Sequence, residues 1–250
     1  MEDNPVNRAV AVRLLERRGQ IVTIAHNGRE AVDLIKTRPF DVALMDLQMP
    51  EMDGLEATAA VRASEEGTGR RLPIVAMTAH AMKGDRERCL RAGMDAYVSK
   101  PVQAGDLFEA IDTATGATSG GAEEPQAPGP TTSRGRGVVD RAALLSRLEG
   151  DASLLAEIVE LFLQTAPRLM RDLKLALTSK DAGKLERAAH TLKGAVANFG
   201  ARPAFEAAFK MEQHGQRGDL ASARKAWASV EKEMARLKKE LERLVEEHAA

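Results

Sequence analysis

The sequence predicts an α/β domain with a doubly wound parallel sheet, linked to an all-α domain that forms an up-and-down four-helix bundle. In residues 1–114, short apolar runs alternate with amphipathic helical patterns, as in parallel sheets built with right-handed crossovers. Residues 115–137 are rich in Gly, Ser, Thr, Pro and Ala and have no periodicity, which indicates a flexible linker. Residues 138–250 show helical periodicity and no strand pattern.

Composition excludes several classes of protein. The 250 residues include 36 basic and 37 acidic side chains, and the net charge of -1 favours neither nucleic acid nor a membrane surface as a partner. A single cysteine, Cys89, rules out a disulfide framework and a cysteine-based zinc site. The sequence has no apolar run of membrane-spanning length, and its N-terminus lacks the features of a signal peptide. We therefore expect a cytoplasmic protein that contacts neither nucleic acid nor membrane.

Caps, breakers and apolar runs define the elements of the first half. Asn4 is a suitable N-cap, and Pro5 a suitable first residue, for a helix that ends at Gly19. Asn27 and Gly28 turn the chain into a second helix. Apolar runs typical of buried strands occupy residues 21–25, 41–45, 73–77 and 95–99. Further helices are expected near residues 55–63, 85–91 and 107–111.

Polar side chains lie where the predicted strands end. Asp46, Thr78 and Lys100 follow three of the strands, and Glu2 and Asp3 stand at the start of the chain. In open α/β sheets this edge is where ligands bind, so we expect these side chains to converge there. A cluster of carboxylates needs a compensating cation, and hard oxygen ligands suit Mg²⁺. A hydroxyl and an ammonium would neutralise phosphoryl oxygens, so the set is what an acyl-phosphate site requires, with Asp46 as the nucleophile.

Five motifs in this part of the sequence resemble, in the same order, those of response-regulator receiver domains. The resemblance covers residues 2–114 and implies a flavodoxin-like fold. The motifs are Glu2-Asp3-Asn4, Met45-Asp46-Leu47-Gln48-Met49-Pro50 with Met52-Asp53-Gly54, Met77-Thr78-Ala79, and Tyr97-Val98-Ser99-Lys100-Pro101.

The resemblance implies a phosphoryl acceptor and a metal site. Asp46 would accept the phosphoryl group. Mg²⁺ would be held by Asp3, Asp46 and the backbone carbonyl of Gln48, and Glu2 would act on the metal through water.

It also implies roles for residues at the ends of the last two strands. Thr78 and Lys100 would contact the phosphoryl oxygens. Thr78 and the aromatic Tyr97 would be the switch residues. The Lys100–Pro101 peptide bond would be cis.

The start of the sequence departs from the receiver pattern. Receivers have an apolar strand directly before the acidic pair, and here only Met1 precedes Glu2. In the receiver strand order 2-1-3-4-5, this first strand lies between the strands that residues 21–25 and 41–45 represent here. Without it, each of these two strands would lack a hydrogen-bonding partner on one side. We expect the natural chain to begin upstream of Met1 and to continue there into a sensor kinase.

Caps and periodicity also predict the helices of the second half. Gly150 ends a short helix over residues 141–148, and Asp151 is a suitable N-cap for a long helix that Pro167 is expected to kink. Later helices are expected at residues 181–198, 203–214 and 220–246.

One histidine in the second half stands off the apolar stripe of its helix. Leu185, Ala189 and Leu192 recur at steps of three and four, whereas His190 points away from them, so we expect it to be exposed. Lys193 and Gly194 share its face, which places a cation and a small residue beside it.

This helix also carries a family resemblance. The string Ala189-His190-Thr191-Leu192-Lys193-Gly194-Ala195 resembles the phosphorylation motif of histidine phosphotransfer (HPt) domains. Met211-Glu212-Gln213 and Gly218-Asp219 also fit, and the resemblance covers roughly residues 138–246. It implies that His190 is a phosphoacceptor and that Lys193 offsets the charge of the phosphate. A neutral imidazole is a competent nucleophile toward an aspartyl phosphate.

Together these features predict a module of two-component phosphorelay signal transduction, as in the C-terminal part of a hybrid sensor histidine kinase. Asp46 would accept phosphoryl groups from phosphohistidine, and His190 would relay them to or from a receiver aspartate. The expected partners are a sensor histidine kinase upstream and the receiver domain of a downstream response regulator. The sequence contains no phosphate-cradling glycine loop, so we expect no ATP-binding kinase domain in this chain.

Two other readings compete with a relay. A haloacid-dehalogenase-type phosphatase also uses an Asp nucleophile, Mg²⁺, a hydroxyl and a Lys, but it needs a second Asp where this chain has Gln48. A docking or adaptor protein with a degenerate, non-phosphorylated receiver is the alternative that stays open, and the missing first strand is what supports it.

Overall fold

The computed structural model describes residues 2, 4–49, 51–78, 83–117, 139 and 141–249. The chain divides into two compact units: Met1–Asp3 with Leu14–Thr132, and Asn4–Arg13 with Ser133–Ala250. Most of the predicted linker, from residue 118 onward, lies outside the described residues. No helix in the described part of the chain is both long and apolar enough to cross a membrane.

The first unit is built on a parallel sheet of three strands, β1 (Ala43–Asp46), β2 (Ile74–Thr78) and β3 (Ala96–Ser99), in the order β1-β2-β3. In register, Asp46 lies opposite Met77, and Thr78 lies opposite Ser99. The strands therefore end at one common edge, as the sequence predicts.

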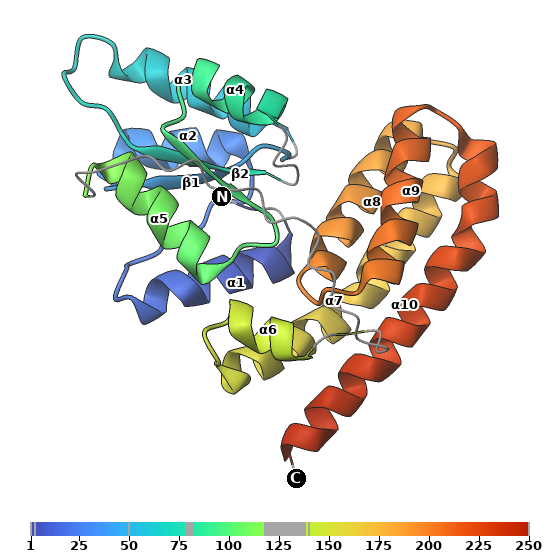
Figure 1. The fold of residues 1–250 in the computed structure, drawn as a ribbon. Helices are drawn as coiled ribbons and strands as arrows, with labels where there is room; N and C mark the ends of the chain where they lie inside the picture. The colour runs from blue at the N-terminus through green and yellow to red at the C-terminus, as the bar shows by residue number, and fades with distance from the viewer. Residues whose placement is uncertain are drawn as a thin grey trace. The chain divides into compact units, whose positions relative to one another are not determined.

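Helices cover both faces of this sheet. The helices of the first unit are α2 (Gly28–Thr37), α3 (Gly54–Glu65), α4 (Lys83–Arg91) and α5 (Ala104–Thr115), whereas most of α1 (Pro5–Arg17) belongs to the second unit. A core that includes Met45, Val61 and Ile74 joins one face of the sheet to α2 and α3, and α5 lies across the opposite face (Figure 1). The expected cap of α1 is present, because Asn4 Oδ1 accepts from the Val6 amide at 3.0 Å. Asn27, expected only as part of a turn, also caps α2, because its side chain accepts from the Glu30 amide at 2.8 Å.

The predicted strand at residues 21–25 is wrong. These residues form no strand, and the side chains of Ile21 and Ile24 are 99% and 40% exposed. An apolar run becomes a strand only if a neighbour accepts its backbone hydrogen bonds, and among the described residues β1 pairs only with β2.

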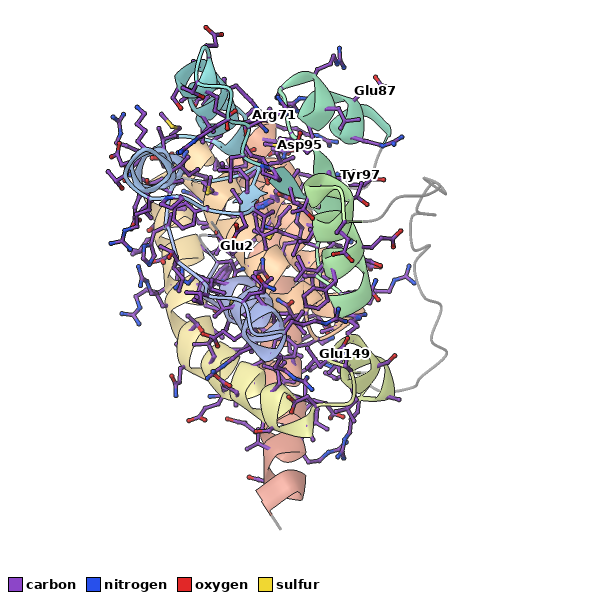
Figure 2. All side chains as sticks on the ribbon, turned by 90° about the vertical axis from the view of Figure 1, so that its left-hand side faces the viewer. Glu2, Arg71, Glu87, Asp95, Tyr97 and Glu149 are labelled. Carbon is purple, nitrogen blue, oxygen red and sulfur yellow. The ribbon has the colours of Figure 1, made fainter. Side chains whose placement is uncertain are left out.

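An ion-pair cluster closes the other end of the sheet. Asp95, just before β3, accepts from Arg62 of α3 and from Arg71, each at 2.8 Å, and from the Ile74 amide at 2.8 Å. Figure 2 shows Arg71 and Asp95 side by side. Glu65 completes the cluster by binding Arg62 at 2.6 Å and the Leu72 amide at 2.6 Å. This cluster connects α3 to the starts of β2 and β3, and the sequence analysis missed it.

The second unit contains a helical bundle close to the predicted one. Its helices are α6 (Arg141–Arg147), α7 (Ala152–Thr178), α8 (Ala182–Ala197), α9 (Arg202–Gln216) and α10 (Leu220–Ala249) (Figure 1). Asp151 caps α7 through the Leu154 amide at 2.9 Å, and Pro167 lies inside the helix. The core includes Phe162 and Phe199, whose ring centroids are 4.7 Å apart, so α7 packs against the end of α8.

Candidate functional sites

The edge of the sheet brings together three of the predicted site residues. Asp46 ends β1, and Lys100 follows β3. The Lys100 Nζ lies 2.5 Å from Asp46 Oδ2 and 2.7 Å from Glu2 Oε2, and all three side chains are buried. Two carboxylates therefore share one ammonium.

The two carboxyl groups determine the protonation of Lys100. Burial by itself lowers the pKa of Lys100, but the charges of Glu2 and Asp46 and their hydrogen bonds outweigh burial and raise it. Lys100 is thus held in its charged form between the two carboxyl groups.

A hard cation fits this donor set, because carboxylate oxygens favour Mg²⁺ over softer metals. Asp3, the other predicted metal ligand, lies outside the described residues. Within the described ranges, no three His, Cys, Asp or Glu side chains are grouped as a ready metal site.

The loop after Asp46 is held by backbone contacts. The Gln48 amide donates to Asp46 Oδ1 at 3.2 Å, and the Gly54 amide donates to the Leu47 carbonyl at 3.1 Å. A Cβ at Gly54 would lie 2.2 Å from the Asp46 carbonyl oxygen, so only glycine permits this approach. Gly54 therefore lets the loop lie tightly against the end of β1.

The remaining predicted residues of this unit lie around β2 and β3. Thr78 is buried at the end of β2, and its carbonyl accepts from the Lys100 amide at 2.7 Å. The Lys100–Pro101 peptide bond is cis, which confirms the prediction. Tyr97 is half-buried in β3, and its ring centroid lies 5.8 Å from the guanidinium carbon of Arg86 on α4.

The second candidate site lies between α8 and α9. His190 Nδ1 is 2.6 Å from Glu212 Oε1, and Lys193 Nζ is 2.9 and 2.7 Å from the two Glu212 oxygens. The Glu212 and Lys193 side chains are each 3% exposed, and the His190 side chain is 13% exposed. Lys193 Nζ also lies 5.5 Å from the centre of the Phe209 ring.

Two expectations about this site need correction. His190 is only slightly exposed, and Lys193 is buried in an ion pair instead of lying beside His190 on an exposed face. The expectation considered α8 alone, whereas α9 covers this face. The helices can approach because α9 has Gly215 where a Cβ would lie 2.6 Å from the Glu186 amide nitrogen.

Glu212 is the functional residue that sequence reasoning missed. Burial raises its pKa, but hydrogen bonds and charges from His190 and Lys193 outweigh burial and lower it. Glu212 is thus an anion that binds both the imidazole and the ammonium. The sequence motif Met211-Glu212-Gln213 indicated that this position matters, but it did not indicate that Glu212 contacts His190 and Lys193.

The fold and the two sites define a protein of two parts: a parallel-sheet domain with a buried carboxylate–lysine cluster at its edge, and a helical bundle with a histidine–glutamate–lysine cluster between two helices. Comparison with known families agrees. Residues 1–112 match the response regulator receiver domain, and residues 157–247 match the Hpt domain. The chain therefore consists of a receiver domain followed by an Hpt domain, the components of a two-component phosphorelay.

Known relatives are much longer proteins. The sensor histidine kinase GacS of Pseudomonas protegens is 35% identical over 198 residues, which cover 78% of this chain and 22% of the relative. Hybrid signal transduction histidine kinase I of Dictyostelium discoideum is 46% identical over 117 residues, which cover 45% of this chain and 7% of the relative. The chain thus spans less than a quarter of these relatives.

A similar solved structure is the receiver domain of a sensor histidine kinase from Pseudomonas aeruginosa with magnesium in its active-site cleft. It is 41% identical and has a TM-score of 0.42, with 46% of this chain and 93% of that chain covered.

Proposed function

We propose that Asp46 and His190 are the two phosphoryl carriers of this module. Asp46 accepts a phosphoryl group from the phosphohistidine of a sensor histidine kinase, and His190 exchanges one with a receiver aspartate, either Asp46 or that of a downstream response regulator. The observation that carries the proposal is the pairing of each carrier with a buried partner, Lys100 at 2.5 Å from Asp46 and Glu212 at 2.6 Å from His190. The proposed place of this exchange is the cytoplasm.

In the receiver, an Asp46 carboxylate oxygen attacks the phosphorus of phosphohistidine. The new O–P bond forms as the N–P bond breaks, and the imidazole leaves with the bonding electron pair. Lys100 is positioned to neutralise a phosphoryl oxygen because its ammonium already contacts Asp46, and Thr78 supplies a hydroxyl from the end of β2.

Mg²⁺ would be held by Asp3, Asp46 and the Gln48 backbone carbonyl, with Glu2 acting through water. When bound, the ion would supply further neutralisation of the phosphoryl charge.

In the bundle, the nucleophile is the Nε2 atom of His190. The ionised carboxylate of Glu212 can only accept a hydrogen bond, so the Nδ1–H group of His190 is the donor. Nε2 therefore carries the lone pair of the neutral ring. Glu212 therefore fixes the reactive tautomer, as a positioning residue. Lys193 balances the charge of Glu212 and keeps it ionised.

The test uses the full chain with a small phosphodonor and Mg²⁺, resolved on phosphate-affinity gels. Asp46→Asn and His190→Gln variants assign each band, and acid or base treatment separates the two linkages, because acyl phosphates are base-labile and phosphohistidines are acid-labile. We expect one linkage to disappear in each variant.

The competing functions give different results. Absence of label on both residues would favour the docking protein with a non-phosphorylated receiver. Rapid turnover of generic phosphoesters, lost in Asp46→Asn, would favour a phosphatase.

A further inference from the structure

The contact between Glu212 and His190 has a consequence for the phosphorylated state of the bundle. Glu212 Oε1 lies 2.6 Å from Nδ1, and Lys193 Nζ lies within 2.9 Å of both Glu212 oxygens. With these side chains buried between α8 and α9, the carboxylate cannot easily turn away from the ring.

The contact with Glu212 favours a ring that keeps its Nδ1 proton after phosphoryl transfer to Nε2. When Nε2 attacks an acyl phosphate, the Nε2–P bond forms and the O–P bond to the aspartate breaks. The ring then carries the phosphoryl group on Nε2 and still has its proton on Nδ1, so it is an imidazolium. If that proton were lost, the Nδ1 lone pair would face the Glu212 carboxylate at hydrogen-bond distance, which places two acceptors against each other.

The protonation of Nδ1 decides how easily the phosphoryl group leaves. From a protonated ring the N–P bond breaks to release neutral imidazole, whereas from an unprotonated ring it must release an imidazolate anion. Neutral imidazole is much the better leaving group.

We propose that Glu212 retains the Nδ1 proton of phosphorylated His190 and thereby keeps the phosphoryl group labile. This inference rests on the proposed function of His190. It adds that Glu212 controls the direction of transfer, because it favours transfer of the phosphoryl group from the bundle to an aspartate. Lys193 supports this role because it pairs with both carboxylate oxygens and so opposes transfer of the ring proton to Glu212.

The variant that tests this is Glu212→Gln, because the Gln amide has the same shape and can donate to an unprotonated Nδ1. In the full chain we expect phosphorylated His190 to persist at least about tenfold longer, the factor for one charge-assisted hydrogen bond. The partition between Asp46 and His190 should shift toward His190. The matched control is Glu206→Gln, also on α9, whose exposed carboxylate binds Arg202 at 2.8 Å and should leave both quantities unchanged.

A second measurement needs no variant. The ¹⁵N resonances of His190 in the phosphorylated wild-type chain should show a protonated Nδ1, whereas an Nδ1 lone-pair signal would overturn the inference even if Glu212→Gln failed to fold. Equal lifetimes and partition in Glu212→Gln and wild type would also overturn it. Absence of phosphohistidine in the wild type would instead refute the proposed function.

Discussion

A close approach of two helix backbones in the bundle makes Gly215→Ala an informative substitution. A Cβ at position 215 would lie 2.6 Å from the amide nitrogen and 2.8 Å from the Cα of Glu186. Both are backbone atoms of α8 and cannot rotate away, so α9 must move outward. Because Glu212 lies one turn before Gly215, the same movement would lengthen its contact with His190.

The expected loss of stability follows from two opposing effects. Overpacking against backbone costs up to about 3 kcal/mol. Alanine is favoured over glycine in a helix by about 1 kcal/mol. We therefore expect Gly215→Ala to lower the free energy of unfolding of the bundle by about 2 kcal/mol.

Urea denaturation followed by Trp227 fluorescence measures this change in the full chain, because the only tryptophan lies on α10 of the bundle. The matched control is Gly183→Ala on α8, where the nearest atoms to a Cβ are 3.7 Å away. That variant should be as stable as wild type or more stable, by up to about 1 kcal/mol. If Gly215→Ala matched the wild type, the close packing of α8 and α9 would be wrong.

Three further predictions concern charge and exposure. Lys100→Met removes the ammonium that Glu2 and Asp46 share, so the free energy of unfolding of the first unit should fall by about 3 kcal/mol. Urea denaturation without Mg²⁺, followed by circular dichroism, measures this fall. Phosphoryl labelling of Asp46 should also become slower. The pKa of Glu212 is lowered from 4.5, so the stability that its carboxylate contributes should be complete above about pH 4.5. That contribution should be lost as the pH falls through the pKa that Glu212 has in the folded protein. In Glu212→Gln, the urea midpoint monitored by tryptophan fluorescence should not show this loss of stability at low pH. Ile21→Ser should change the thermal unfolding of the first unit by less than about 0.5 kcal/mol, because Ile21 is 99% exposed; a larger loss would show that this segment is buried.

Most of the fold could be predicted because its signals are local. Asp151, for example, accepts from the amide three residues ahead, which is the interaction that makes it a recognisable cap. The failure at residues 21–25 has a non-local cause. An apolar run shows that a segment can be a strand, but pairing depends on a neighbour elsewhere in the chain.

The sites differ in the same way. Asp46 and Lys100 could be brought together from sequence because parallel strands end at one edge of their sheet. Glu212 could not be joined to His190, since the helix pattern gives a face for each residue but not which helix faces which. Their contact depends on the approach of α8 and α9 at Gly215, a packing event that no single-helix pattern contains.

The two sites use the same pair of charges in different arrangements. In the receiver, the ammonium of Lys100 contacts Asp46 directly, so in the proposed function a phosphoryl group that arrives at Asp46 meets a cation at once. In the bundle, the ammonium of Lys193 contacts Glu212, and Glu212 contacts the histidine. In the proposed function, the bundle therefore orients its nucleophile and controls its proton, while stabilisation of the transferring phosphoryl group falls mainly to the receiver.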